Sequence, residues 1–266
     1  MAHCVIASRC CTRPLNSVVS HQRRTVPENA DTTFWTAVAK MAVADDDLAK
    51  TRMSLAAFTA ATFSQVGREL HDIGHIFGPD RAKGASPHGH GHGSDEVVAV
   101  ALLFRICGEL VSSFATLFET GRLYAAAALL RQIVEIEYLA WAFQTRDKDA
   151  ERWLRSTREE RQSFFAPAKL RQASLGKFRG QDYGYHCELG GHPVPGSSIL
   201  LDDNSQLRQL LLADLLGHTG RIWDHLVLWA DGSAVTVPLH TRQPEMVARY
   251  TEWKHRDPLT GFPPPP

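Results

Sequence analysis

The sequence predicts an all-α protein, folded as an up-and-down bundle of helices. Apolar residues recur every three or four positions over long stretches, which is the period of an amphipathic helix. Helix-capping residues precede several of these stretches, and Ser94 before the pair Asp95-Glu96 is an example. Strand-like segments do not alternate with the helical ones, so the pattern favours a bundle over an α/β fold. The clearest apolar stripe comprises Leu55, Phe58, Thr62, Val66, Leu70, Ile73 and Phe77.

The first half of the chain predicts three helices. A capping cluster at residues 31–33 begins the first helix, and the acidic run at residues 45–47 begins the second, where it complements the helix dipole. The second helix stops at a loop over residues 78–94 that is rich in Gly, Pro and His. A third helix is then expected to extend to about Thr120.

The second half of the chain predicts further helices that complete the bundle. Gly121 breaks the chain, and a fourth helix extends from there to about Thr145. A fifth, highly charged helix is expected over residues 147–172, with a disturbance at Pro167 because proline lacks a backbone donor. The remaining expected elements are a long Gly- and aromatic-rich loop, 173–204, and a sixth helix, 205–230.

We expect one bundle domain, residues 31–230, between two different ends. Residues 1–27 hold four arginines, no acidic residue and no continuous apolar region of a secretory signal. Residues 1–30 are therefore expected to be a disordered arm or a stretch upstream of the true start codon, and the acid-poor, Arg- and Ser-containing stretch 1–27 would also suit an organellar transit peptide. Residues 231–266 are expected to be a tail with one short helix that begins at Pro244 and a polyproline end.

Composition excludes several classes of protein. The 29 Lys and Arg residues equal the 29 Asp and Glu residues, so the formal net charge is zero and a strongly basic nucleic-acid-binding coat is excluded. The longest apolar runs, 97–104 and 123–130, are far shorter than the roughly 18 residues of a membrane span. The five cysteines are odd in number and lack CxxC spacing, so we expect reduced thiols and a cytosolic protein without membrane contact.

Two apolar helices each carry an Arg and a Glu four residues apart. These pairs are Arg105 with Glu109, and Arg131 with Glu135. In an antiparallel hairpin that turns near Thr120, Arg105 would face Glu135 and Glu109 would face Arg131, which predicts one buried, compensated charge cluster. The cluster could fix the register of the two helices, or it could form the polar floor of an active site. Glu137, on another face, is expected to meet solvent or a partner chain.

The second feature is a group of aromatic and proton-transferring side chains before the sixth helix. Histidine gives and takes protons near neutral pH, and a neighbouring Tyr or Glu could orient it. A loop of this length is uncommon unless it has a function or is disordered. The group is therefore either a catalytic element or a surface loop whose polar groups cap helices. It comprises Tyr183, Tyr185, His186, Glu188 and His192.

Residues 95–230 resemble a known family. The run LYAAAALLRQIVEIEYLAWAF, the charged helix after it and the element YHCELGGHP are similar to a bacterial helical family of unknown function near the HEPN (higher eukaryote and prokaryote nucleotide-binding) domains. The resemblance implies a helical bundle that is often a homodimer. It also implies a protein that acts on RNA or a nucleotide, in many cases as a metal-independent ribonuclease of a toxin or defence system.

The same resemblance implies roles for particular residues. The HEPN motif is an Arg followed a few residues later by a His, and His192 matches that His with Glu188 as the polar residue before it, while Cys187 stands at the Arg position. The alternative pair Arg179 and His186 restores the spacing but leaves His192 without a role. His192 or His186 would act as the general base on a ribose 2′-hydroxyl. Arg131 would stabilise the developing negative charge, and the implied site also includes Glu135 and Tyr185.

Other histidines suggest metal binding. His71 and His75 are four residues apart, which places both on one helix face, and three more follow in the loop at His88, His90 and His92. The motif HDIGH lacks the Glu of the zinc proteases, and no cofactor is expected.

A further polar face lies on the sixth helix. Asp214, His218, Arg221 and His225 occur at steps of four, three and four residues. This face is either solvated or lines the same cleft as His192.

Three functional hypotheses therefore remain. The first is a HEPN-like protein that acts on RNA or a nucleotide. The second is a non-catalytic, dimeric interaction module whose Arg–Glu cluster is structural. The third is a metal-binding protein that uses His71, His75 and the histidine loop.

Overall fold

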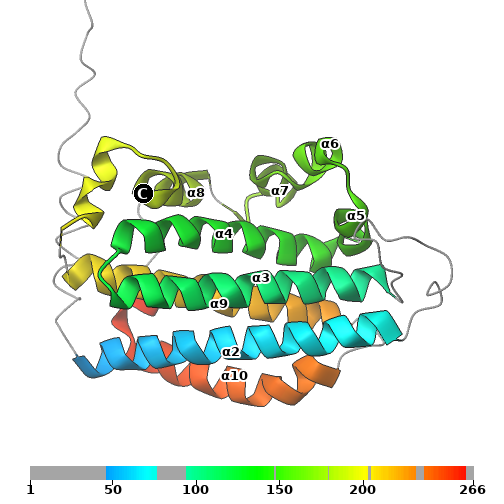
Figure 1. Cartoon of the computed structure of the whole chain (residues 1–266), viewed down its shortest axis with the longest axis horizontal. Helices are drawn as coiled ribbons and strands as arrows, with labels where there is room; N and C mark the ends of the chain where they lie inside the picture. Colours follow the sequence, from blue (N-terminus) through cyan, green and yellow to red (C-terminus); the bar gives the residue numbers. More distant parts are fainter. Residues whose placement is uncertain are drawn as a thin grey trace, which may run out of the picture.

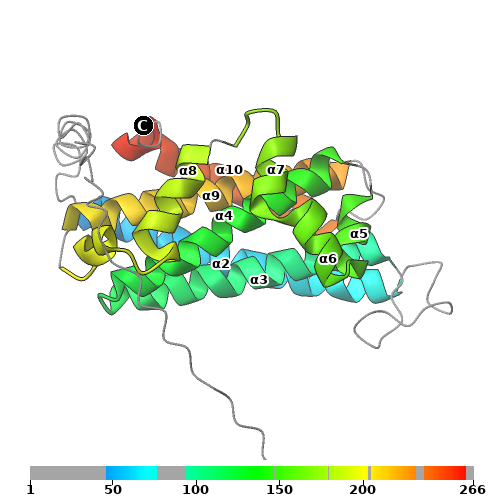
Figure 2. The same ribbon diagram turned by 90° about the horizontal axis from the view of Figure 1, so that it is seen from above.

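The protein is an all-α bundle, as the sequence predicts. The structure is a computed structural model, and it describes residues 46–76, 94–146, 148–178, 180–202, 205–231 and 237–261. Long helices lie side by side with their axes roughly aligned, and shorter helices form a second layer over one of them, α4 (Figure 1, Figure 2). The long helices are α2 (Asp46–Ile76), α3 (Asp95–Glu119), α4 (Leu123–Thr145), α9 (Ser205–Asp231) and α10 (Val237–Arg256).

The helices α2 and α3 pack closely because glycines line their contact. A Cβ atom added at Gly108 would lie 2.5 Å from Ser64 Oγ and 2.9 Å from the Ser64 backbone nitrogen. A Cβ atom at Gly67 would lie 2.6 Å from Cγ of Arg105. Only residues without a side chain allow the two backbones to approach this closely.

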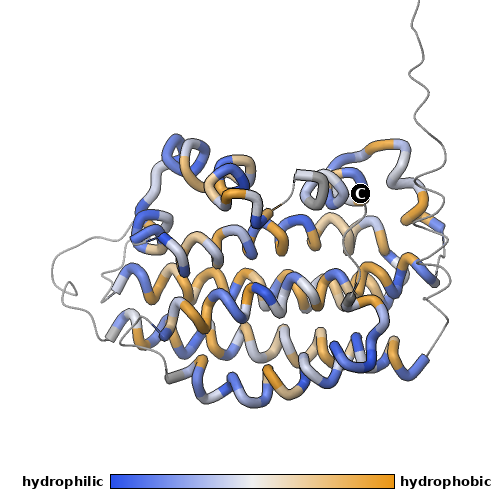
Figure 3. Tube along the Cα trace, turned by 180° about the vertical axis from the view of Figure 1, so that it is seen from behind, coloured by the Kyte–Doolittle hydropathy of each residue, from blue (hydrophilic) through white to orange (hydrophobic). Residues whose placement is uncertain are grey.

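The helix α3 lies at the centre of the bundle. Ser94 caps its N-terminus, with the side chain accepting from the Val97 backbone N–H, as the sequence predicts. By length and composition α3 is apolar enough to cross a membrane, with a mean hydropathy of 1.9 in its most apolar window, but 61% of that window is buried inside the protein. Burial against α2 and α4 therefore accounts for this hydropathy, and hydrophobic residues recur along the other long helices as well (Figure 3).

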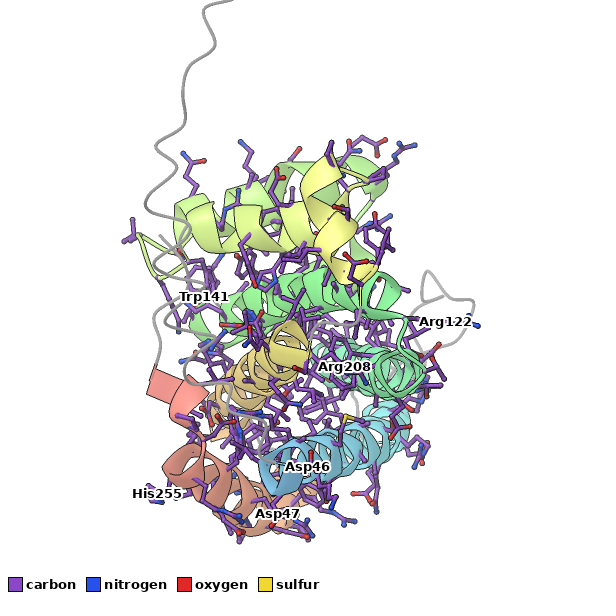
Figure 4. All side chains as sticks on the ribbon, turned by 90° about the vertical axis from the view of Figure 1, so that its left-hand side faces the viewer. Asp46, Asp47, Arg122, Trp141, Arg208 and His255 are labelled. Carbon is purple, nitrogen blue, oxygen red and sulfur yellow. The ribbon has the colours of Figure 1, made fainter. Side chains whose placement is uncertain are left out.

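The turn between α3 and α4 is held by α9. Arg208 of α9 donates from Nη2 to the Phe118 carbonyl oxygen at 3.1 Å, and its guanidinium lies 4.7 Å from the centre of the Phe118 ring. Figure 4 looks at the bundle from this side and labels both Arg208 of α9 and Arg122, which lies in the turn between α3 and α4. The side chain is thereby a further donor to a carbonyl at the end of α3 that also accepts from the Gly121 backbone N–H at 3.1 Å.

The expected charged helix over 147–172 is interrupted more than once. It consists of α5 (Asp149–Arg155), α6 (Arg158–Glu160), the π-helical turn η1 (Arg161–Phe165) and α7 (Pro167–Ala173). Thr157 forms a capping box with Glu160, which starts a new helix after α5. Pro167 occupies the first turn of α7, where its missing N–H costs nothing, so the disturbance expected at this proline is confirmed.

The expected loop over 173–204 is wrong in part, because much of it is helical. It contains α8 (Gly180–His186), the π-helical turn η2 (Cys187–Gly191) and the 3₁₀ helix η3 (Pro195–Leu200). Two of the glycines that suggested a loop, Gly190 and Gly191, pack closely against α4. A Cβ atom at Gly190 would lie 2.6 Å from the backbone carbon of Ala127 in α4.

The C-terminal helix is longer than predicted. It begins at Val237 and contains Pro244, whereas the prediction placed the proline at the helix start. Proline prefers the first turn of a helix, and in α10 that position is occupied by Pro238. The buried residues of α10 join the core of the bundle, so residues 237–261 pack as part of it. These buried residues are Leu239, Met246, Tyr250 and Trp253.

A buried ion pair joins the end of α10 to α2. The Arg52 guanidinium donates to both carboxylate oxygens of Asp257 at 2.6 Å, and the two side chains are 3% and 0% exposed. Trp253 donates to the same carboxylate, and the backbone N–H of Leu259 donates to it at 2.9 Å.

Three predicted features lie outside the described residues. They are the helix that begins at residues 31–33, the histidine loop and the polyproline end.

Candidate metal centre

Five polar residues from three helices meet inside the bundle. Glu137 comes from α4, His186 from the end of α8, and Asp214, His218 and Arg221 from α9. We call them the buried histidine cluster. The residues Glu137, His186 and His218 are each only 2% exposed, although their side chains are strongly polar. The short α8 lies over α4 and α9, which brings His186 down onto the α9 residues (Figure 2).

Glu137 orients His218 and is itself held by Arg221. Its Oε2 lies 2.6 Å from His218 Nδ1, and its Oε1 accepts from Arg221 Nε at 2.7 Å. Arg221 Nη2 also lies 2.8 Å from His218 Nδ1. Because one ring nitrogen cannot donate and accept at once, and because a carboxylate is the stronger partner, His218 Nδ1–H donates to Glu137. The Nε2 atom of His218 is therefore directed away from α4, toward His186 and Asp214.

Two more potential ligand atoms surround His218 Nε2. It lies 3.2 Å from His186 Nε2 and 3.3 Å from Asp214 Oδ1. The other Asp214 oxygen, Oδ2, is buried without a hydrogen-bond partner among the described residues and lies 3.7 Å from His186 Nδ1. The Asp214 side chain as a whole is 27% exposed, so one edge of the cluster faces solvent.

Charge controls the protonation of the cluster when no ion is bound. Burial alone would raise the pKa values of Glu137 and Asp214, but His218, Arg221 and, for Asp214, His186 lower both pKa values to about 2. Burial and Arg221 act to lower the pKa of His218, but Asp214 and Glu137 outweigh them and raise this pKa to about 9. The carboxylates of Glu137 and Asp214 and the guanidinium of Arg221 together carry a net charge of about −1. Without a metal ion, the protonated His218 imidazole compensates this charge.

The three atoms that face one another have the spacing of metal ligands. His186, Asp214 and His218 each offer one ligand atom, and these atoms lie within 4.8 Å of one another. With metal–ligand bonds of about 2.05 Å, the separation of 3.2 Å between the two Nε2 atoms corresponds to an angle of about 103° at the metal. The separation of 3.3 Å between His218 Nε2 and Asp214 Oδ1 corresponds to about 107°, close to a tetrahedral angle.

A second polar group, the Tyr183 cluster, lies on the outer side of α4. The Tyr183 hydroxyl donates to Glu135 Oε1 at 2.7 Å and accepts from Arg131 Nη2 at 3.1 Å. Burial and the bond to Glu135 raise the pKa of Tyr183 to about 12, so the phenol keeps its proton. Arg131 and Arg171 both lie over this ring, at 5.6 and 4.4 Å from its centre. The cluster comprises Arg131, Glu135, Arg171 and Tyr183.

The predicted cross-hairpin charge cluster is wrong. Arg105 and Glu109 are exposed, and Arg131 pairs with Glu135 on its own helix at 3.3 Å. The prediction assumed that all four residues face the other helix of the hairpin. Instead, the Cγ atom of Arg105 lies against Gly67 of α2. The expectation that Glu137 meets solvent or a partner is also wrong, because Glu137 is the buried carboxylate of α4.

The residues of the predicted catalytic loop separate into different environments. His186 is buried, and the ring of half-buried Tyr185 lies 5.4 Å from it. Glu188 and His192 are exposed. Arg131 and Glu135 belong to the Tyr183 cluster. The structure therefore does not gather the predicted catalytic set into one group.

The two histidines on the polar face of α9, His218 and His225, are buried, whereas Asp214 is half-buried and Arg221 is exposed, so the solvated interpretation is wrong for the histidines. Beyond the buried histidine cluster, His225 Nδ1–H donates to Gln144 Oε1 at 2.7 Å, and Nε2 accepts from Lys177 Nζ at 3.1 Å. Burial and Lys177 lower the pKa of His225 to about 4, so this imidazole is neutral. Sequence reasoning recorded the spacing of four, three and four residues but did not connect it with Glu137 or His186.

The other predicted metal residues lie elsewhere. His71 and His75 belong to α2, apart from the buried histidine cluster, while His88, His90 and His92 lie outside the described residues.

Comparison of the chain with protein-family models, with curated proteins and with solved structures finds no match.

Proposed function

We propose that this protein binds a divalent transition-metal ion through His186, Asp214 and His218. The observation that supports the proposal is the approach of three potential ligand atoms from two separate helices, within 4.8 Å of one another, with His218 Nε2 at 3.2 Å from His186 Nε2 and 3.3 Å from Asp214 Oδ1. Two imidazoles and one carboxylate form a donor set that suits Zn²⁺ or Fe²⁺. Three protein ligands leave at least one coordination position for water or another small ligand, which is the pattern of a catalytic rather than a structural site.

The surroundings of the ligands favour a metal over a purely structural ion-pair network. A network that only joined α4 to α9 would need Glu137, His218 and Arg221, and would not need His186 or Asp214. Asp214 Oδ2, the oxygen beside the proposed ligand atom Oδ1, is buried and has no hydrogen-bond partner among the described residues, which is costly in a purely structural network. The partly exposed edge of Asp214 offers an ion a route into the cluster.

Glu137 and Arg221 hold the ligands in place. A ligating histidine usually donates its other N–H to a carboxylate, which fixes its tautomer and increases its basicity. Glu137 has this position relative to His218, and Arg221 keeps the Glu137 carboxylate oriented. A metal would replace the proton on His218 Nε2, so binding should release protons and weaken at low pH.

Metal content and affinity test the proposal. Untagged protein is expressed in medium with Zn²⁺, Fe²⁺ and Mn²⁺ and dialysed, and its metal is then measured by mass spectrometry. We expect wild-type protein to hold about one ion per chain. Asp214→Asn should lower the metal affinity at least about tenfold, because the amide removes the anionic ligand with little change in shape. His192→Ala is the matched control. His192 is exposed and lies six residues after the ligand His186, so its replacement should leave metal binding unchanged.

Far-UV circular dichroism and urea unfolding establish that Asp214→Asn protein is folded before its metal content is compared. If folded wild-type protein and Asp214→Asn protein bind all three metals with equal affinity, the proposal is wrong. It is also wrong if dialysed wild-type protein retains no metal and has no affinity tighter than millimolar.

RNA or nucleotide handling is a second candidate, and the Tyr183 cluster favours it. Two guanidinium groups lie over one partly exposed tyrosine ring, an arrangement that suits a phosphate beside a stacked base. The test is total-RNA integrity after expression of wild-type, Arg131→Ala and His192→Ala protein. Intact RNA in every case excludes a nuclease, and light scattering tests the homodimer that the family resemblance implies.

A further inference from the structure

A histidine pair on α2 lies outside the buried histidine cluster. His71 and His75 are one helical turn apart near the C-terminal end of α2, and both are partly buried. Their Nε2 atoms are 3.1 Å apart, and their ring centres are 4.3 Å apart. The two Nε2 atoms are therefore the facing nitrogens of the pair, within hydrogen-bond distance of each other.

We propose that His71 and His75 form a second site for a transition-metal ion, independent of the buried histidine cluster. With bonds of about 2.05 Å, a separation of 3.1 Å between the nitrogens corresponds to about 98° at the ion, which suits neighbouring positions of a four- or six-coordinate metal. Imidazole pairs bind Ni²⁺, Cu²⁺ and Zn²⁺, and water completes the coordination of a two-ligand site.

The surroundings of His71 disfavour its protonated form. Burial lowers the pKa of His71, and the charges of His75 and Arg105 lower it further, against a smaller opposite effect of Asp72. A neutral imidazole has the free lone pair that a metal requires. Arg105 is also a nearby positive charge that weakens cation binding, so we expect this site to have lower affinity than the buried histidine cluster.

Other histidines in the sequence provide the main competing explanation. The segment between α2 and α3 contains His88, His90 and His92, and its two ends meet where the Ser94 backbone N–H donates to the Gly74 carbonyl at 2.8 Å. A His-rich tract binds Ni²⁺ weakly without any built site. An experiment must therefore distinguish ions held by α2 from ions held by this tract.

Ni²⁺ titration by calorimetry provides the test, with untagged, full-length Asp214→Asn protein as the background. The carboxylate ligand of the first site is then absent, so failure of the first proposal does not affect this one. Adding His75→Gln, which keeps a polar side chain of similar length, should weaken Ni²⁺ binding at least about tenfold because one of the two protein ligands is lost. Circular dichroism verifies the fold of each variant.

The control is the triple change of His88, His90 and His92 to Ala in the same background. We expect it to alter the α2 affinity less than about threefold, because the pair on α2 stays intact. The proposal is wrong if the triple variant loses Ni²⁺ binding while His75→Gln retains it, or if the background protein binds no Ni²⁺ at all.

Discussion

Glu135 and Glu137 lie two residues apart on α4, and the structure gives them opposite roles. Glu137 is 2% exposed and bonds His218 and Arg221 at 2.6 and 2.7 Å. Glu135 is 32% exposed and pairs with Arg131. Replacing each by Gln keeps the size of the side chain and removes only the charge. We expect Glu137→Gln to destabilise the protein far more than Glu135→Gln.

The structure sets the size of this effect. Removing one partner of a buried ion pair costs about 3–5 kcal/mol, because the remaining charge is left uncompensated. His218 is 2% exposed and cannot reach water, but Arg221 is 48% exposed and can turn outward. We therefore expect the lower end of the range, about 3 kcal/mol for Glu137→Gln. Glu135→Gln should cost less than about 1 kcal/mol, as for other exposed pairs.

Urea unfolding followed by far-UV circular dichroism measures both values, with a chelator present so that metal does not contribute. For a domain of this size, about 3 kcal/mol corresponds to a fall in Tm of roughly 6–12 °C. Equal losses for the two variants would refute the reasoning, because they would show that Glu137 is solvated or that its charge is not needed by His218. A larger loss for Glu135→Gln would refute the assignment of the two faces.

Three further outcomes are expected. Without metal, the stability contributed by Glu137 is complete above its ordinary pKa of 4.5 and is lost as the pH falls toward about 2, so acid unfolding of Glu137→Gln protein should be less steep in this range. Gly108→Ala should cost about 1–3 kcal/mol in urea unfolding, because its Cβ would overlap the Ser64 backbone; a neutral effect would contradict the close packing. Leu175 is 95% exposed and has a φ of 51°, which glycine adopts without strain. Leu175→Gly should therefore raise the free energy of unfolding by less than about 1 kcal/mol, and a fall larger than that in thermal unfolding would contradict the strain.

The fold class could be predicted because local patterns determine it. The apolar stripe of α2 and the Ser94 cap of α3 are properties of neighbouring residues, and the structure confirms both. The helical content of residues 173–204 could not be read in the same way. Gly190 and Gly191 pack against α4, and a contact between segments distant in sequence leaves no local pattern.

The candidate site was only partly predictable for the same reason. The sequence points to His186 and His218 separately, but their meeting depends on how α8 is placed over α9. Glu137 was misplaced because α4 is apolar almost all round, so the sequence alone does not show which of its faces meets α9. A buried carboxylate on such a helix requires a partner, and that requirement was the available signal.

The ion pair between Arg52 and Asp257 has a practical consequence for shortening the chain. A version that ended at Arg256 would keep the whole of α10 yet leave the Arg52 guanidinium buried without its carboxylate. Truncation should therefore be tolerated only beyond Leu259, which bonds the same carboxylate through its backbone. One acidic side chain just after α10 thus sets how far the chain can be shortened from its C-terminal side.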